Sequence, residues 1–448
     1  MTFIPHAEAD RREMLRTIGV SSEDELFGNI PEKFRLDGEI DLPSALSEWE
    51  ALAALRELAG ESRGLICFAG AGYYDHHVPA AVDHLIRRSE FYTAYTPYQA
   101  EVSQGTLQSI YEYQTMVCEL MGLDVANASM YDGASAMAEA ALMAYAIQRN
   151  RNKVIVSHTV NPHYRQVLDT YNMGLGLPVE LAPRTDAGVT DLERLEEMLD
   201  DETAAVIVQS PNFYGVIEDI EGAATAAHDA GALLIAVADP ISLALLKSPG
   251  ECGADIAVAE GQPLGNPLSY GGPVVGLFAA RKAYIRQMPG RIVGVTEDVE
   301  GRRGFVLTLQ TREQHIRREK ATSNICTNQG LNALAATIYL ATMGREGLRQ
   351  VAEASAGIAH FAYDRILELG FEPLFPDAPF FREFTIRTPA PAREIIERGV
   401  ERGVLAGVAL SRFPHLDIDD GLLIAFTEKR SQRDLDLLFA VLKEYSNG

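Results

Sequence analysis

Three polar segments follow directly after apolar runs that are typical of buried strands, and their residue types are suited to binding or transforming a small ligand. The run GADIAV leads into AEGQPLGNPLSYGGP (259–273), where Gln262 opens a turn rich in Gly and Pro. The run ALLIAVAD (232–239) ends in Asp239, and another strand precedes QSPNFYGVIED (209–219). In open α/β sheets, ligands bind at the carboxyl ends of the strands. These turns are therefore the first places where we expect chemistry.

Asp239 has two interpretations at this position. A carboxylate at the end of a buried strand is costly unless it is paired, so Asp239 is suited to facing a protonated ring nitrogen of a ligand. It is equally suited to capping the next helix, because Pro240 would then occupy the first helical position. The turn at 209–219 is likewise either a ligand-binding turn or an ordinary one.

The start of an Ala-rich helix in SMYDGASAMAEAALMAYAI (129–147) is a second candidate binding element. Its first residues are Asp132, Gly133, Ala134 and Ser135, which are small enough to let an anion approach the free backbone N–H groups. The positive end of the helix dipole favours the same ligand. A capped and tightly packed helix explains the pattern equally well.

A polar loop, TAYTPYQAEVSQG (93–105), concentrates hydrogen-bonding side chains that include Tyr95, Tyr98, Gln99, Glu101 and Gln104. Tyr and Gln can hold a small polar substrate, and Glu can take up an amine or a proton. The alternative is a surface loop whose tyrosines pack on a neighbouring subunit.

A basic segment, TREQHIRREKATSNICTNQ (311–329), carries Arg312, Arg317, Arg318 and Lys320 in a chain that is otherwise acidic. Its local charge is suited to guiding an anionic group or partner. The alternative is an exposed helix in which Glu313 and Arg317 form an i,i+4 pair. The TSN that follows is a plausible helix N-cap through Ser323 or Asn324.

The elements that must position these residues change in character along the chain. Residues 1–65 predict a helical arm, because Leu46, Trp49, Leu52, Leu55 and Leu58 recur at three-residue steps. From about 125 to 280, short β-branched runs alternate with helices, which predicts a mostly parallel sheet in a large domain (66–325). A long helix and a small α+β domain are expected over 326–448. The predicted fold class is therefore α/β.

Composition excludes several classes of function. The 448 residues are 47% apolar and 23% charged, which is typical of a globular protein, and the net charge of −24 repels nucleic acids and anionic membranes. No apolar run approaches the ~20 residues of a membrane helix, and the amino-terminal stretch does not resemble a signal peptide. The four cysteines are scattered, which predicts neither a disulfide framework nor a metal site. We expect a cytoplasmic protein.

Four long stretches together resemble the glycine dehydrogenase (decarboxylating) family, the P-protein of the glycine cleavage system, and more narrowly its subunit 1 branch, which is related to the N-terminal half of longer P-proteins. The resemblance runs nearly end to end. It rests on YTPYQAEVSQGTLQ, YQTMVCELMGLDVANASMYDGASAMAEA, ADIAVAEGQPLGNPLSYGGP and REQHIRREKATSNICT.

The resemblance implies the fold of the type I pyridoxal-phosphate enzymes, similar to aspartate aminotransferase. It also implies an activity: glycine is decarboxylated with pyridoxal phosphate, CO2 leaves, and the aminomethyl group passes to the lipoyl arm of the H-protein. Glycine dehydrogenase subunit 2 is the implied partner, and the T-protein and L-protein are the further members of the system.

In the family, the lysine that forms the Schiff base with the cofactor belongs to subunit 2, and counting back from Gly271-Gly272-Pro273 places it at Gln262. An amide cannot form an imine, so we expect no catalytic residue in this chain alone and a degenerate pocket made by Asp132 to Ser135, Asp239 and Gln262. Asp239 lies 23 positions before Gln262 (262 − 239 = 23), a shorter interval than in the catalytic subunit. Neither Lys247 nor Lys282 lies in the turn that faces the pocket.

The resemblance therefore predicts that this subunit completes a pocket of its partner. The residues expected to line that pocket across the subunit interface, against substrate or cofactor, are Tyr95, Tyr98, Gln99, Glu101, Thr322, Asn324 and Cys326. Two alternatives are a self-contained pyridoxal enzyme of another reaction class and a structural subunit that only stabilises its partner.

Overall fold

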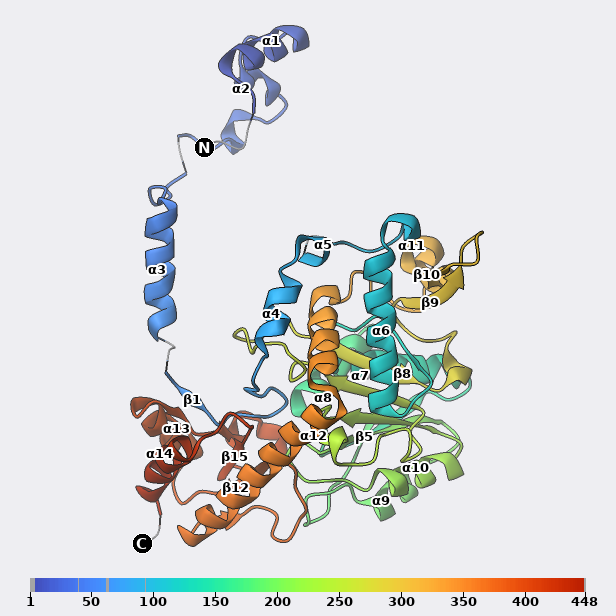
Figure 1. Ribbon diagram of the computed structural model, residues 1–448, viewed down its shortest axis with the longest axis vertical. Coiled ribbons are helices and arrows are strands. Elements are labelled where there is room, and N and C mark those ends of the chain that lie inside the picture. Colours follow the sequence, from blue (N-terminus) through green and yellow to red (C-terminus); the bar gives the residue numbers. More distant parts are fainter. Residues whose placement is uncertain (1–4, 39, 62–63, 93, 447–448) are drawn as a thin grey trace. The chain divides into compact units, whose positions relative to one another are not determined.

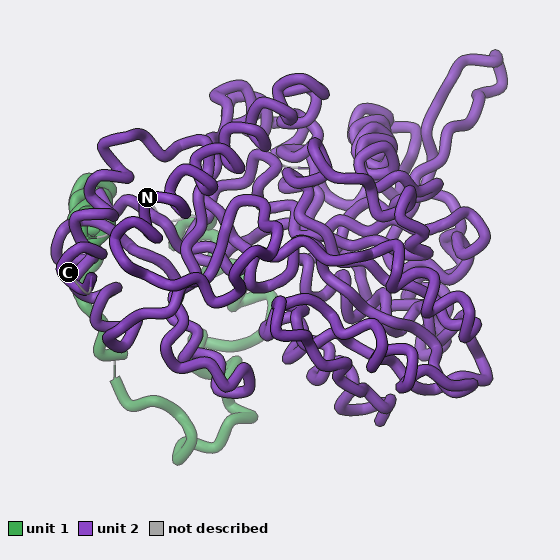
Figure 2. The backbone as a smooth tube through the Cα atoms, turned by 90° about the horizontal axis from the view of Figure 1, so that it is seen from below, with its two compact units in different colours: residues 1–63 green, residues 64–448 purple. Residues whose placement is uncertain are grey.

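The computed structural model describes residues 5–38, 40–61, 64–92 and 94–446, and these residues form two compact units (Figure 2). Unit 1 comprises residues 1–63 and unit 2 residues 64–448. The first four residues, positions 39, 62 and 63 of the predicted arm, and Thr93 of the polar loop lie outside the described residues, as do positions 447 and 448.

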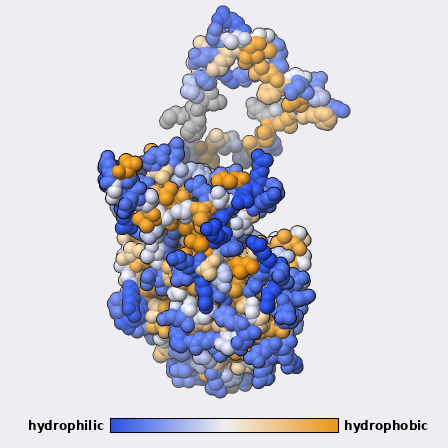
Figure 3. Space-filling view, turned by 90° about the vertical axis from the view of Figure 1, so that its right-hand side faces the viewer, coloured by the Kyte–Doolittle hydropathy of each residue, from blue (hydrophilic) through white to orange (hydrophobic). Residues whose placement is uncertain are grey.

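Unit 1 is helical, and its described residues form no buried core. Its helices are α1 (Glu8–Ile18), α2 (Glu23–Leu26) and α3 (Glu48–Glu61), and none of their described residues is buried. The predicted apolar repeat falls largely on α3, where the side chains of Trp49, Leu55 and Leu58 are exposed. Figure 3 shows hydrophobic atoms at the surface of the molecule among many hydrophilic ones.

The centre of unit 2 is a seven-stranded sheet within the described residues, in the order β2-β8-β7-β6-β5-β3-β4 (Figure 1). Strands β3 to β7 run parallel to their neighbours in this group, and only β8 pairs antiparallel with both β7 and β2. The mostly parallel sheet expected from the sequence is thus confirmed. The strands are β2 (Val125–Ala126), β3 (Lys153–Ser157), β4 (Val179–Ala182), β5 (Thr203–Ser210), β6 (Leu233–Ala238), β7 (Ile256–Glu260) and β8 (Gly276–Ala280).

Helices cover both faces of this sheet because successive strand residues point to opposite sides. Val154 and Val156 of β3 pack into the cluster that includes α7 and α8, whereas Ile155 packs into the cluster of α9 and α10. Helices α6 and α12 pack on the β7–β8 end of the second face. The helices are α4 (Ala80–Ile86), α5 (Ser89–Tyr92), α6 (Gln104–Met121), α7 (Gly133–Ile147), α8 (Pro162–Asn172), α9 (Leu192–Met198) and α10 (Ile220–Asp229).

The C-terminal part is an α+β layer, as the sequence predicts. Helix α12 (Gly330–Glu368) leads into it and is interrupted at Gly344, whose φ of 59° lies outside the helical range. An antiparallel sheet in the order β11-β12-β15-β14 then packs against α13 and α14. These elements are β11 (Glu372–Pro373), β12 (Glu383–Arg387), α13 (Ala392–Glu401), β13 (Val404–Leu405), β14 (Val408–Ala409), β15 (Gly421–Ala425) and α14 (Gln432–Lys443).

Two smaller features complete unit 2. A hairpin of β9 (Ile292–Glu297) and β10 (Arg303–Thr308) precedes the short helix α11 (Gln314–Arg317), and β1 (Ile66–Cys67) pairs with β13.

The four cysteines are free. Over the described residues, the helices are too short or too polar to span a membrane, and no group of side chains has the composition of a metal site.

Candidate functional site

The turn after β7 is closed by the side-chain amide of Gln262, which is 1% exposed. Its Oε1 accepts from the backbone N–H of Tyr74 (2.9 Å), and its Nε2 donates to the carbonyl oxygens of Tyr74 (3.1 Å) and Asn266 (2.8 Å). Both amide protons and the carbonyl oxygen are therefore engaged. Gln262 thus fastens the Gly- and Tyr-rich segment 69–77 to the end of the sheet.

The start of α7 lies beside this turn, and carboxyl groups of the chain itself accept from two of its free N–H groups, those of Gly133 and Ser135. Asp132 is the N-cap, and its Oδ1 accepts from the N–H of Ser135 (2.7 Å). Glu260, the last residue of β7, accepts from the N–H of Gly133 through Oε2 (3.0 Å) and from that of Gln262 through Oε1 (2.9 Å). Burial raises the pKa of Glu260 to about 8. The anion-binding end of the helix is thus filled from within.

Asp239, at the end of β6, faces a guanidinium group. Its Oδ2 lies 2.5 Å from Nη2 of Arg382, and its Oδ1 accepts from the N–H of Ile241 (2.9 Å). The carboxylate therefore pairs with the cation and also holds the turn that follows, so each of its two oxygens has a partner inside the chain.

Arg382 is 1% exposed and links Asp239 to the segment 69–77. Its guanidinium stacks on the ring of Tyr74, with 3.6 Å from Cζ to the ring centroid, and contacts Nε2 of His76. Burial, followed by the charge of Arg382, lowers the pKa of His76. The neutral ring then accepts at Nε2 and donates from Nδ1 to Glu428 (2.6 Å).

Glu383, the neighbour of Arg382 on β12, is buried below the same segment. Its carboxyl group accepts from the hydroxyl of Tyr74 and from the N–H of Ala71 (3.1 Å). Burial raises the pKa of Glu383 to about 7. The segment 69–77 is thus held by side chains from the turn after β7, from β12 and from the segment after β15.

The polar loop and the basic segment meet elsewhere on unit 2, around Arg291, which is 4% exposed. Its Nη2 donates to the hydroxyl of Tyr98 (2.8 Å) and lies 3.9 Å from Sγ of Cys326, while its Nε is 3.2 Å from Oε2 of Glu313. The hydroxyl of Tyr95 lies 3.4 Å from that of Thr327. A cavity of about 270 Å³ between these loops is lined by Tyr95, Thr96, Arg291, Thr327 and Asn328 among others.

The remaining residues that the sequence places in this group are all solvent-exposed. Gln99 and Glu101 lie in the loop and the turn that precede α6, and Thr322 and Asn324 lie in the segment after the basic run. None of these four residues lines the 270 Å³ cavity, whereas Tyr95 does. Tyr98 and Cys326 are exposed too, and both contact Arg291.

Two expectations for the basic segment are wrong. Arg312 is not on an exposed helix, because its guanidinium donates to the carbonyl oxygens of Met288, Leu309 (3.3 Å) and Gly290 (3.1 Å). Glu313 pairs with Arg291, and Arg317 instead donates to the carbonyl of Thr311 (3.1 Å).

The suggested helix caps in TSN are also wrong. Helix α12 begins six residues after Asn324, at Gly330, with Gln329 as its N-cap residue. The hydroxyl of Ser323 accepts from the N–H of Ile325 (3.1 Å) and so shapes the loop before the helix.

The model of one protein family, described as glycine cleavage system P-protein, matches residues 1–442. The chain belongs to this family. Among its relatives, a protein from Carboxydothermus hydrogenoformans named probable glycine dehydrogenase (decarboxylating) subunit 1 is 54% identical over 445 residues and 99% of both chains. The protein with the same name from Moorella thermoacetica is 52% identical over 444 residues and 99% of both chains. Both names describe one subunit of a larger enzyme.

Solved structures of proteins similar to this chain identify its fold. A crystal structure of glycine decarboxylase (P-protein) of the glycine cleavage system, in inhibitor-bound form, superposes with a TM-score of 0.91 at 47% identity and covers 99% of this chain and 100% of its own. A NifS-like protein superposes with a TM-score of 0.63 at 12% identity, over 85% of this chain and 98% of its own. The P-protein family member described here therefore has the fold of type I pyridoxal-phosphate enzymes, as the sequence predicts.

Pyridoxal phosphate does not fit the pocket beside Gln262 in this P-protein chain. The cavity lined by Asp239, Glu260, Pro263, Arg382 and Glu383, among others, is about 30 Å³, which is room for about two water molecules. The chain has seven lysines, and none of them lines this cavity. The N–H of Gly133 and the carboxylate of Asp239 have partners within the chain.

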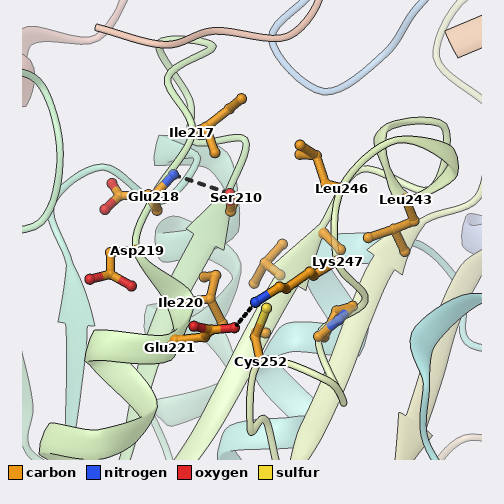
Figure 4. Close-up of a pocket in the computed structure, with 14 residues that line it drawn as sticks. Ser210, Ile217, Glu218, Asp219, Ile220, Glu221, Leu243, Leu246, Lys247 and Cys252 are labelled. Carbon is orange, nitrogen blue, oxygen red and sulfur yellow. Dashed lines mark hydrogen bonds and ion pairs between the residues drawn. The ribbon is translucent and has the colours of Figure 1, made fainter. Parts of the chain in front are cut away.

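Lys247 does not line the pocket beside Gln262. It lines a different cavity, of about 220 Å³, and its Nζ lies 2.6 Å from Oε1 of Glu221. Figure 4 shows Lys247 pointing toward Glu221. The hydrogen bond that Lys247 donates to Glu221 raises the pKa of the lysine amine, which favours the protonated form that is not a nucleophile. Lys282 lies after β8, and it too is absent from the lining of the pocket beside Gln262.

Sequence reasoning missed four residues that organise the two sites. They are Glu260, Arg291, Arg382 and Glu383. One signal was available: Glu260 ends the apolar run of β7, and Arg382 and Glu383 open the apolar strand FREFTIR, where charges are costly unless they are paired. The sequence around Arg291 carries no comparable signal.

We predict that Glu383→Gln makes the stability of the chain less dependent on pH. The pKa of Glu383 is raised from 4.5 to about 7 in the folded state, so the folded state binds the extra proton and the free energy of unfolding falls as the pH rises from about 5 to about 8. By linkage this loss is about 2 kcal/mol. Glutamine can still accept from the N–H of Ala71 and contact Tyr74, so the substitution removes the ionisable group and keeps these contacts. Urea unfolding at four pH values in that range measures how the free energy of unfolding depends on pH.

Glu353→Gln is the matched control, because Glu353 is an exposed carboxylate on α12 that pairs with Arg349. The Glu383→Gln curve of unfolding free energy against pH is expected to be flatter than the curves of the control and the natural chain. Three parallel curves would contradict the buried ionisation of Glu383.

Proposed function

We propose that this P-protein family member is the subunit without the cofactor lysine in a glycine decarboxylase built from two related chains. The observation that supports the proposal most strongly is the position and the hydrogen bonding of the Gln262 side chain. It occupies the turn after β7 where the family's Schiff-base lysine is expected, and its amide is buried and fully hydrogen-bonded within the chain. A chain with this pocket needs a partner that holds the cofactor.

The proposed partner is glycine dehydrogenase subunit 2, which carries the lysine. The names of the relatives support this assignment, because they describe a subunit 1 and so imply at least one other subunit. The assembled enzyme would decarboxylate glycine and transfer the aminomethyl group to the lipoyl arm of the H-protein, with the T-protein and L-protein completing the system. Pyridoxal phosphate supplies the electron sink for decarboxylation and would be held by the partner.

The contribution of this chain would come from the exposed residues around Arg291. Tyr95, Tyr98, Gln99 and Glu101 are proposed to position glycine or the cofactor across the interface, with Thr322 or Asn324 reaching the phosphate and Cys326 beside them. The hydrogen bond from Arg291 to Tyr98 supports this role, because it fixes the tyrosine without a bound ligand. Preorganised groups of this kind lower the entropic cost of forming a site.

Two other functions predict different results. A self-contained pyridoxal enzyme of another class would need an amine nucleophile, and no lysine lines the pocket beside Gln262. A purely structural subunit would stabilise its partner without contacting the reactants. Substitutions in the exposed loop separate this last alternative from the proposal.

We predict that Tyr95→Phe and Glu101→Gln each reduce kcat/KM for glycine about tenfold or more in the assembled complex, since each removes a polar contact to the reactants. Exchange of bicarbonate into glycine measures the reaction, and size-exclusion chromatography measures assembly. Tyr145→Phe on α7 and Glu353→Gln on α12 are the matched controls. Intact assembly with unchanged exchange in both loop variants would favour the structural alternative.

The basic segment is proposed to guide the H-protein. Arg318 and Lys320 are exposed, whereas Arg312 is engaged with backbone carbonyl groups. We therefore predict that Arg318→Glu combined with Lys320→Glu raises KM for the H-protein, and that the increase is larger at an ionic strength of about 0.02 M than at about 0.3 M. Arg393→Glu, which changes an exposed arginine of α13, is the control. An unchanged dependence on salt would contradict this docking role.

A further inference from the structure

A separate cavity of about 390 Å³ lies at the β4 edge of the large sheet. One wall is apolar and comes from Val156 of β3, Leu168 of α8, and Val179 and Leu181 of β4. The polar side chains that line it are Arg165, Gln166, Asp169 and His415. Its volume falls in the range of small-molecule sites.

Arg165 is the unusual member of this lining. It is 7% exposed, and its Nε and Nη2 are buried without a hydrogen-bond partner among the described residues. Burial lowers the pKa of Arg165, as expected for a cation that has lost water. A buried guanidinium is costly unless an acceptor faces it, and native structures rarely leave such groups unpaired.

Basic side chains lie around Arg165 although the chain as a whole carries −24, and the groups that favour the charged form of Arg165 are Tyr214 and then Asp169. Burial, followed by the charge of Arg165, lowers the pKa of His158, with smaller contributions from Arg184 and His415. Burial and then the charge of Arg165 also lower the pKa of His415. Asp169 is the acidic residue of the lining, and it is exposed and forms no ion pair with Arg165 within the described part of the chain.

The cavity is distinct from the pocket beside Gln262. Tyr164, the residue before Arg165 on α8, lines the pocket beside Gln262, whereas Arg165 lines the cavity at the sheet edge. Consecutive residues of a helix point about 100° apart, so α8 separates the two. The polar loop and Arg291 belong to neither lining.

We propose that this cavity binds a small organic oxyanion, a carboxylate or a phosphomonoester with an apolar body. The guanidinium group of Arg165 would donate to the oxygens of the anion, and the body of the ligand would lie on Val179 and Leu181, the apolar side chains of the lining that have accessible surface. Planar forks of this kind match the oxygens of carboxylates and phosphates. The site goes beyond the proposed decarboxylase function and does not depend on it.

The test uses phenyl phosphate and benzoate as probes, titrated by calorimetry into the full chain, with sodium chloride at matched ionic strength as the control. We expect saturable binding of at least one probe. Arg165→Met should weaken this binding about tenfold or more, because the substitution removes the guanidinium group. The tighter probe assigns the head group, and either assignment supports the proposal.

A second measurement keeps the result interpretable if the substitution affects folding. In buffer without the probes, Arg165→Met is expected to unfold at the same or a higher temperature than the natural chain, because it removes an unpaired buried charge. The probes should raise the unfolding temperature of the natural chain and leave that of the variant unchanged. Arg393→Met, which changes an exposed arginine of α13, is the control for the loss of an arginine side chain.

The proposal would be overturned if neither probe bound the natural chain saturably, or if Arg165→Met bound them within twofold of the natural affinity. A variant that unfolds at a markedly lower temperature without probe would also contradict it, because that result would assign Arg165 a structural partner.

Discussion

The architecture of the site depends on one amide. Gln262 bonds to both backbone polar groups of Tyr74 and to the carbonyl of Asn266, so the segment 69–77 is fixed over the carboxyl ends of the parallel strands. A lysine at this position could donate but could not accept from the N–H of Tyr74. The glutamine at this position therefore has a structural role, because its side chain ties the turn after β7 to the segment 69–77.

The charges around this amide form a connected set that joins the large sheet to the C-terminal α+β layer. Asp239 at the end of β6 pairs with Arg382, which contacts His76, and His76 donates to Glu428. Removing one member of such a set would leave a buried charge without a partner, which is strongly destabilising. The same set keeps Asp239 engaged with a cation of the chain. The pocket is therefore maintained by interactions that are specific to it, and this favours division of labour between two chains over simple decay of an active site.

Much of this structure follows from local patterns in the sequence. The β-branched runs, the turn at Gln262 and the cap at Asp132 are encoded by neighbouring residues, so the strands, the sheet and the helix start could be predicted. The partners of these residues could not, because Tyr74 lies 188 positions from Gln262 and Arg291 lies 193 positions from Tyr98. The partners of the basic segment could not be predicted from the sequence either. Charge spacing suggested an exposed helix, but Arg312 turns to the carbonyl groups of Met288 and Gly290, which only the fold brings near.

The central claim is that this chain completes an enzyme without holding its cofactor. The most direct measurement is borohydride reduction of the complex formed by co-expression with subunit 2, followed by mass spectrometry of the peptides from both chains. We expect a pyridoxyl group on one lysine of the partner and none on the seven lysines of this chain. A pyridoxyl lysine in this chain, in the complex or alone, would contradict it.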